Sequence, residues 1–293
     1  MVGQRRLRWW AALFLAPAVI LTAVFFYYPM AYILWLSMHH WNGLSPVKPF
    51  TGLAEFRHLF KQPIFGLVIR NTAIFVVGTV VPSIAIGLAL ALLANRRLPF
   101  RSFLRGVSFA PYLVSFVSAG LAWVWMGSSG GLFDHLMGFL GFHPGNLVDN
   151  PSYALLYVIA MYTWKMAGYN MVLYLAGLQT IPREIYEAGA IDGLQDGWTQ
   201  FRTITWPLLA ESTFFVVIIN LIFSFRAFSA IYVMTNGGPV NSTTTLVYYI
   251  WNLAFVQNSW GQAAAASALL LIVVLALTVG MVRYFTKESF RAS

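Results

Sequence analysis

Six apolar segments, each about twenty residues or longer and nearly free of charge, alternate with short polar segments along the chain. Such a segment is long enough for a helix to cross a hydrocarbon core of about 30 Å. Membrane-spanning helices are predicted near residues 9–38, 72–94, 103–126, 153–178, 207–234 and 263–285. Several spans contain proline, which is tolerated because neighbouring helices satisfy the freed backbone groups. The pattern predicts an all-α, polytopic membrane protein with six transmembrane helices.

Composition supports this class. Hydrophobic residues make up 59% of the chain and charged residues 9%, whereas a soluble domain carries about 25% charged residues. The first apolar run follows Arg5, Arg6 and Arg8. It is too long for a signal-peptide core and lacks a convincing small-residue cleavage site, so it is predicted to be an uncleaved span. The chain has no cysteine, which excludes disulfides and thiolate metal sites.

The net charge of +9 is explained by the orientation of the spans rather than by nucleic-acid binding, because the basic residues cluster at the ends of apolar runs. One side of the predicted membrane receives Arg5, Arg6, Arg8, Arg96, Arg97, Arg101, Arg105, Arg183, Arg202, Arg283, Lys287 and Arg291. The other side receives Lys48, Arg57, Lys61 and Arg70, all in the first loop. Both termini and the 179–206 loop are therefore predicted to be cytoplasmic.

The 179–206 loop is unusually acidic for this chain. Four of the nine acidic residues fall within thirteen positions of it: Glu184, Glu187, Asp192 and Asp196. Thr180 and Pro182 predict a helix start, because a proline in the first turn lacks only an N–H that would be unpaired anyway. Glu184 and Glu187 then lie near the positive end of the helix dipole, where anions are favoured.

Small residues shape the rest of this helix. Ala188 and Gly189 add almost no bulk, so the helix can press its backbone closely into a groove. Asp192-Gly193 predicts the helix end, because glycine tolerates the left-handed conformation found there. Asp196 is predicted to cap a second short helix, and Pro207 to open the fifth span.

The predicted result is a helix–turn–helix elbow that can transmit force from a cytoplasmic partner into the membrane helices. The alternative is an amphipathic loop that rests on lipid headgroups, although anionic lipids would repel its acidic residues.

At these residues the chain resembles the permeases of binding-protein-dependent ABC importers. Their cytoplasmic "EAA…G…I.LP" signature is matched by Glu187-Ala188-Gly189, by Gly193, and by Ile204-Thr205-Trp206-Pro207. The chain departs from the signature at Gly189 and Trp206, and it has one extra residue near Gln195-Asp196. "WKMAGYNMVLYLAGLQTIPREIYEAGAIDG", "FSFRAFSAIYVMTNGGPVNSTTTLVYYIW" and "SFAPYLVS" are similar to the sugar and glycerol-phosphate branch of this family.

The resemblance implies a MetI-like permease core at 70–285, which contains the coupling loop at 179–206. An N-terminal part (1–69) with the first span precedes the core, and a cytoplasmic tail (286–293) follows it. It also implies a second homologous permease subunit, a dimer of ATPase subunits, an extracytoplasmic substrate-binding protein and a location in the plasma (inner) membrane of a prokaryote. In this family the elbow is the coupling helix. Glu187 would meet a basic residue of the ATPase, and Gly193 would shape the turn.

A chain that binds ATP through a phosphate-binding loop carries Gly-Lys followed by Ser or Thr. No lysine of the chain follows a glycine. Hydrolysis is therefore expected on a separate subunit, with ATP and Mg bound there and no cofactor on this chain. The five histidines lie outside the predicted spans without metal-ligand spacing. No paired carboxylates or nucleophile elbow is found, so the chain is not expected to be an enzyme.

Ionisable groups inside a membrane are functional candidates, because burying charge there is expensive. Lys165 and Arg226 fall in the fourth and fifth spans, where they could line a substrate path. The alternative is that each pairs with backbone carbonyls inside the bundle, or that Arg226 extends outward to the interface. Further candidates for the path on these two spans are Tyr169, Asn170, Asn220, Phe225 and Phe228, although most aromatic residues in such spans serve packing.

The function predicted is half of the translocation path of an ATP-driven importer for a sugar or glycerol-phosphate-type solute. Two rivals are weaker. An ion-coupled secondary transporter or channel would need a carboxylate relay within the spans, and only Glu211 is available. An intramembrane enzyme would need paired catalytic groups, and none is found.

Overall fold

The computed structural model describes residues 2–96, 99–139, 141, 145–194 and 196–292. Two residues of the predictions above, Arg97 and Gln195, lie outside this part of the chain. The described residues are almost entirely helical, and their only β feature is an isolated bridge between His39 and Phe50. The all-α class is confirmed. The chain divides into two compact units, and each is described by itself.

The first unit comprises Met1–Phe65 and Tyr249–Val273. Its helices are α1 (Val2–Thr22), a π-helical turn η1 (Ala23–Tyr27), α2 (Tyr28–Leu36), α3 (Ala54–Lys61), η3 (Asn252–Val256) and the first part of α15 (Trp260–Ala292). A hydrogen bond of 2.9 Å joins the Gln62 and Gln262 side chains. Lys48 lies over the Trp41 ring and donates to the Tyr32 hydroxyl, so this basic residue is held by aromatic groups.

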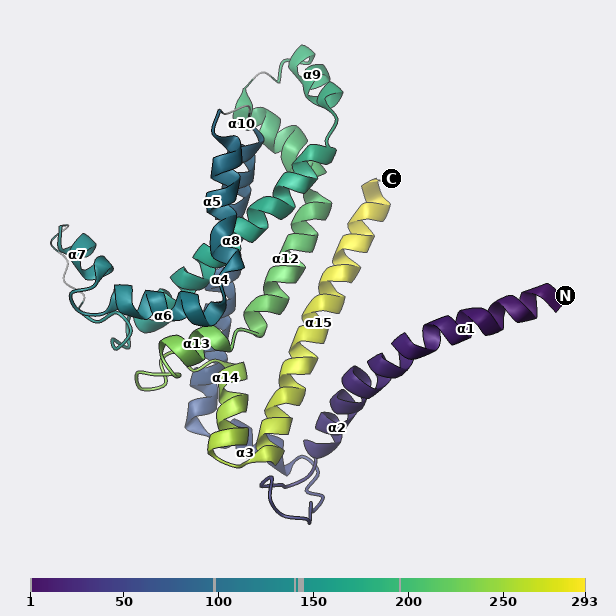
Figure 1. Ribbon diagram of the computed structural model, residues 1–293, viewed down its shortest axis with the longest axis vertical. Helices are drawn as coiled ribbons and strands as arrows, with labels where there is room; N and C mark the ends of the chain where they lie inside the picture. Colours follow the sequence, from purple (N-terminus) through teal and green to yellow (C-terminus); the bar gives the residue numbers. More distant parts are fainter. Residues whose placement is uncertain (1, 97–98, 140, 142–144, 195, 293) are drawn as a thin grey trace. The chain divides into compact units, whose positions relative to one another are not determined.

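The second unit comprises Gly66–Tyr248 and Val274–Ser293. It holds most of α4 (Pro63–Asn95), α5 (Arg101–Leu113), α6 (Phe116–Gly127), α7 (Leu132–Gly138) and α8 (Ala154–Thr180). After these come α9 (Arg183–Ile191), α10 (Gly197–Gln200), η2 (Phe201–Thr205), α11 (Trp206–Leu208), α12 (Ala210–Phe225), α13 (Ser229–Met234) and the first half of α14 (Leu246–Trp251). Helix α8 is the central element, because it packs against α5 and α12 (Figure 1).

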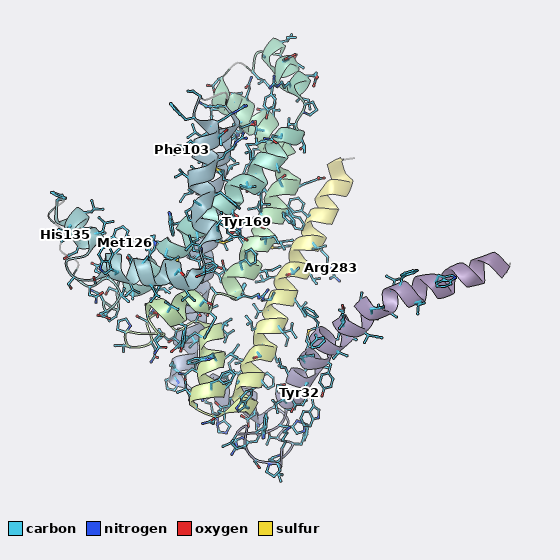
Figure 2. The ribbon with its side chains drawn as sticks, viewed as in Figure 1. Tyr32, Phe103, Met126, His135, Tyr169 and Arg283 are labelled. Atoms are coloured by element: carbon cyan, nitrogen blue, oxygen red, sulfur yellow. The ribbon has the colours of Figure 1, made fainter. Side chains whose placement is uncertain are left out.

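Helix α8 is buried along most of its length, including its polar residues Thr163, Lys165 and Asn170. Many apolar side chains on other helices project outward, as Phe103 does on α5 (Figure 2). An apolar exterior around a partly polar core is expected of a helix bundle in lipid, where the surroundings are as apolar as leucine.

Within the part of the chain that the structure describes, three helices are long and apolar enough to cross a membrane: Leu13–Leu36, Pro63–Asn95 and Trp260–Arg283. The number rises to five if each of two bent pairs is one span. The continuous helices predicted at 103–126 and 207–234 are both interrupted, the first at Val114-Ser115 and the second at Leu209 and again after Phe225. The count of six spans and the cytoplasmic placement of both termini stay predictions.

Candidate functional site

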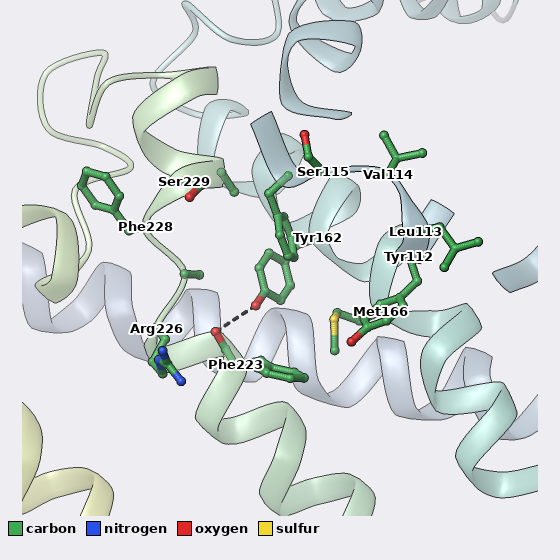
Figure 3. Close-up of a pocket in the computed structure, with 13 residues that line it drawn as sticks. Tyr112, Leu113, Val114, Ser115, Tyr162, Met166, Phe223, Arg226, Phe228 and Ser229 are labelled. Carbon is green, nitrogen blue, oxygen red and sulfur yellow. Dashed lines mark hydrogen bonds between the residues drawn. The ribbon is translucent and has the colours of Figure 1, made fainter. Parts of the chain in front are cut away.

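A cavity of about 490 Å³ lies in the second unit where two helices are interrupted (Figure 3). One side comes from the junction of α5 and α6, another from the junction of α12 and α13, and α8 closes the space between them. The lining residues are Tyr112, Leu113, Val114, Ser115, Phe116, Tyr162, Met166, Phe223, Arg226, Ala227, Phe228, Ser229 and Ala230. Irregular backbone at membrane depth is tolerated where protein buries it or where it lines a cavity.

The first junction is a sharp turn. Helix α5 ends at Leu113, Val114 is extended with ψ 141°, and α6 leaves at 98° to α5. Ser115 caps α6, because its hydroxyl accepts a hydrogen bond from the Ser118 N–H at 3.0 Å. The N-terminus of α6 is thus satisfied locally, whereas the last carbonyls of α5 have no helical partner of their own.

Lys165 satisfies these carbonyls. Its side chain is only 1% exposed, and its ammonium group donates to the carbonyl oxygen of Pro111 at 2.7 Å and to that of Val114. The same nitrogen lies 4.7 Å from the centre of the Phe116 ring. The sequence left open whether Lys165 lines a substrate path or pairs with backbone carbonyls inside the bundle. In the structure it pairs with backbone carbonyls.

The second junction follows α12. Arg226 occupies the position after Phe225, and α13 starts at Ser229. The hydroxyl of Tyr162 on α8 donates to the Phe223 carbonyl at 2.8 Å, as Figure 3 shows. The side chain of Arg226 is exposed and lines the cavity. No hydrogen bond or ion pair engages its guanidinium group among the residues that the structure describes.

The other predicted path residues are divided. Phe228 lines the cavity. Tyr169 does not line the cavity, but its ring stacks on that of Tyr112, which does, with ring centres 4.5 Å apart. Phe225 faces a separate small pocket between α12 and α15.

Asn170 and Asn220 form a buried pair in which each amide donates to the other, at 3.1 and 2.7 Å. Both side chains are fully enclosed in the bundle, at 0% and 2% exposed. In the structure these amides join α8 to α12 and do not line the cavity.

Sequence reasoning did not select Tyr112, Ser115, Phe116 or Ser229 for the path. For the first junction the signal was present in "SFAPYLVS", where a proline is followed after three residues by a serine suited to capping a new helix. Inside an apolar run, such a pair marks an interruption that apolarity alone conceals.

The elbow has two arms: the first is α9, and the second is α10 with η2. Helix α9 starts at Arg183 with Pro182 at its N-cap position. Thr180 is the last residue of α8, where its hydroxyl bonds back to the Gly177 carbonyl, so the predicted role of Thr180 in starting this helix is wrong. Glu184 lies in the first turn, and Glu184 and Glu187 are both exposed.

The predicted end of α9 at Asp192-Gly193 is confirmed. Gly193 has φ +88°. The N–H of Leu194 bonds to the Gly189 carbonyl at 2.9 Å, and that of Gly193 to the Ala190 carbonyl at 3.3 Å. These are the two bonds of a Schellman end, which requires a left-handed residue at this position.

Gly189 packs inside the elbow. It is buried, and a Cβ at this position would lie 2.6 Å from Cδ1 of Ile204 on η2. The hydroxyl groups of Tyr186 and Thr205 are 3.1 Å apart across the same contact. Ala188, in contrast, is exposed. The close approach predicted for the small residues is therefore made by Gly189 to the second arm of the elbow.

The start of the second arm is also fixed by residues close to it in the sequence. The Asp196 carboxylate accepts the Thr199 N–H at 3.0 Å, which confirms it as the cap of α10. This backbone hydrogen bond, with one from the Thr199 hydroxyl, lowers the pKa of Asp196. Pro207 lies within α11, and the bend of 68° follows it before α12 begins at Ala210. Ile191 and Trp198 remain largely exposed.

Comparison with known proteins decides the family. A model described as "Binding-protein-dependent transport system inner membrane component" matches residues 83–289, well over half of the chain. The chain belongs to this family. The resemblance seen in the sequence is therefore confirmed, and the protein is a permease subunit of an ABC importer rather than an enzyme. It is a multi-pass membrane protein of prokaryotic type.

Relatives match this permease along nearly its whole length. The sn-glycerol-3-phosphate transport system permease protein UgpA of Agrobacterium fabrum is 35% identical over 94% of each chain. The lactose transport system permease protein LacF of Rhizobium radiobacter is 36% identical over 91% of this chain and 90% of its own. A probable ABC transporter permease of Pyrococcus horikoshii is 34% identical over 91% and 92%.

A solved structure supports the fold. A chain of a bacterial alginate ABC transporter, crystallised with an alginate pentasaccharide-bound periplasmic protein, superimposes with a TM-score of 0.83. The match covers 96% of this permease and 95% of that chain, at 21% identity. The MetI-like fold is thereby confirmed. Within the described residues, no group of three or more histidine and acidic side chains is placed to hold a metal ion.

Proposed function

We propose that this permease forms half of the translocation path for a sugar or glycerol-phosphate-type solute, and that the cavity between the two helix junctions is its part of that path. The observation that carries the proposal is the position of the cavity. It lies where two helices are interrupted within a bundle, the arrangement in which transporters commonly bind their solutes. Aromatic faces, the Ser229 and Ser115 side chains, and one exposed arginine offer stacking, hydrogen bonding and charge.

Arg226 is the residue that we propose meets the solute. It follows the last residue of α12 and lines the cavity, and its guanidinium group makes no hydrogen bond or ion pair with another described residue. A guanidinium group binds a phosphate through two parallel hydrogen bonds, and it donates single bonds to sugar hydroxyls. The relatives named for glycerol 3-phosphate and for lactose make both chemistries reasonable.

Uptake by the complete transporter in proteoliposomes tests this role, with sn-glycerol 3-phosphate and lactose as solutes. For an anionic solute, Arg226→Gln should lower uptake by more than about tenfold, because a charge-assisted pair inside a cavity is lost. Arg226→Lys should retain part of the activity, since it keeps the charge without the paired donors. Unchanged uptake in Arg226→Gln, with the transporter normally assembled, would remove Arg226 from the path.

The elbow is proposed to couple this path to an ATPase subunit. Its first arm presents Glu184 and Glu187 to solvent, and Ile191 and Trp198 add exposed apolar surface. Exposed acidic groups on α9 and an exposed aromatic group on α10 suit docking into a basic cleft better than contact with anionic lipid. The further partners proposed are a second homologous permease and an extracytoplasmic binding protein, in the plasma (inner) membrane. ATP and Mg would be bound by the ATPase.

A pull-down of the tagged chain in mild detergent, followed by mass spectrometry, tests the assembly. Recovery of an ATPase and a second permease is expected. Glu187→Lys should reduce recovery of the ATPase but not of the second permease. Lys61→Glu, a charge change in the first loop, serves as the control and should leave both. Recovery of the unmodified chain alone or only with itself would overturn the proposed coupling role of the elbow.

A further inference from the structure

One helical turn of α8 contacts both interruptions that border the cavity. Tyr162 and Lys165 are three residues apart, so their side chains leave neighbouring points on the helix surface. Tyr162 donates to the Phe223 carbonyl at the end of α12. Lys165 donates to the Pro111 and Val114 carbonyls at the end of α5. The Tyr162 side chain therefore bonds to the end of α12, and the Lys165 side chain bonds to the end of α5.

The ring of Phe116 connects these two groups. It is the first residue of α6 and stacks on Tyr162 with centres 5.1 Å apart and planes at 26°. On the α5 side, the Lys165 nitrogen is 4.7 Å from its centre. Phe75 of α4 packs edge-on against Tyr162 at 5.3 Å. Both junctions are therefore fastened to the same rigid segment of α8.

The Pro111 and Val114 carbonyls take their hydrogen bonds from Lys165. The Phe223 carbonyl accepts the Arg226 N–H at 3.2 Å as well as the Tyr162 hydroxyl, which ties this end of α12 to α8. A helix end leaves its last carbonyls without intrahelical partners, and neither water nor other backbone is freely available inside an apolar bundle. A cation at the negative end of α5 also opposes the helix dipole. An unpaired buried lysine would be expensive in the same place. The donors and the acceptors thus satisfy each other.

We propose that Tyr162 and Lys165 are positioning residues that hold the two helix junctions and so set the shape of the cavity, and that Lys165 does not meet the solute. The inference deepens the proposed function and rests on it, because the cavity is taken to be the solute's path. It divides the two basic residues of these spans into different roles. Arg226 faces the solute, whereas the donors of Lys165 are used by the protein.

Hydrogen exchange followed by mass spectrometry on the complete transporter tests the proposal. In Lys165→Met, exchange of the amides at 109–118 should accelerate by about tenfold, because the bonds from a charged donor that hold this junction are lost. The amides at 222–231 should exchange as in the unmodified protein. Tyr162→Phe, which keeps the ring and removes only the hydroxyl, should show the reverse pattern. Lys165→Arg, which keeps its donors, should stay close to the unmodified protein at both junctions.

The outcomes separate the possibilities. A merely structural role would loosen both segments together in either variant, and that result overturns the proposal. Unchanged exchange at 109–118 in Lys165→Met overturns it as well. No solute is needed for the measurement. If the exchange pattern is as expected but Arg226→Gln transports normally, the positioning roles stand and the role of Arg226 in the path fails.

Discussion

The elbow and the cavity both depend on interrupted helices, but they stabilise the interruptions differently. In the elbow, the end of α9 at Gly193 and the cap of α10 at Asp196 are made by bonds between residues at most five positions apart. At the cavity, the ends of α5 and α12 accept hydrogen bonds from Lys165 and Tyr162, which are more than fifty residues distant in the sequence. The end of α12 is also bonded locally, by the Arg226 N–H. An interrupted helix that is exposed to water can rely on local caps, because water molecules hydrogen-bond to the remaining backbone groups at its ends. At the break after α5, inside the bundle, the donor comes from another helix.

The contrast predicts that substitutions near the cavity have larger effects than similar ones in the elbow. The largest effect is expected at Gly168 on α8. A Cβ there would overlap with the backbone carbonyl oxygen of Ser108 on α5. The two helices could no longer approach closely at the turn that follows Lys165. We expect Gly168→Ala to lower the free energy of unfolding by about 2 kcal/mol, as overpacking does.

Unfolding of the full chain by titration with a denaturing detergent in mixed micelles measures this change. Gly106→Ala on α5 is the matched control. A Cβ at Gly106 meets nothing within 4 Å, and alanine in a helix interior is favoured by about 0.5–1 kcal/mol. Equal free energies of unfolding for Gly168→Ala and Gly106→Ala would contradict the close approach of α5 and α8.

The same contrast explains what could be predicted from the sequence. The ends of α9 and α10 were predictable because glycine and aspartate act on their own neighbours. The interruptions at Val114 and after Phe225 were not predicted, because they lie inside apolar runs and hydrogen bonds from α8 contribute to holding both of them. Lys165 was visible as an intramembrane cation, but only the fold indicates that its donors are used by the Pro111 and Val114 carbonyls. Arg226 carries the same charge in the next span and lines the cavity instead.

A smaller effect is expected at Gly193, where the difficulty is conformational and local. With φ +88°, an L residue at this position is strained by about 1–2 kcal/mol. Gly193→Ala should therefore fray the end of α9, with faster exchange of the amides of Gly193 and Leu194, and leave the amides around the cavity unchanged. Gly197→Ala is the control, since it stands at the first position of α10 without a positive φ. Loosening at the cavity in Gly193→Ala would show that the elbow and the core are not independent.

The smallest effect is expected at Asp196, and it should depend on pH. Hydrogen bonds from Thr199 lower the pKa of this carboxyl in the folded chain. A group whose pKa is lowered by folding contributes stability above its unfolded pKa of about 4, and this contribution is lost as the pH falls through the folded value. Asp196→Asn keeps the cap without the titration, because asparagine is as good an N-cap residue as aspartate.

The ratio of Thr199 amide exchange rates in the two proteins, followed from pH 7 downward, isolates the carboxylate, because the intrinsic pH dependence of exchange cancels. The ratio should be constant at neutral pH. Below about pH 4 the protein with Asp196 should exchange relatively faster, as its carboxylate gains a proton. Asp196→Ala, which has no cap, should exchange faster than both at neutral pH. A ratio that stays flat at low pH would mean that α10 is held by the packing of η2 against α9 and not by its cap, and the elbow would then resemble the cavity in depending on a distant partner.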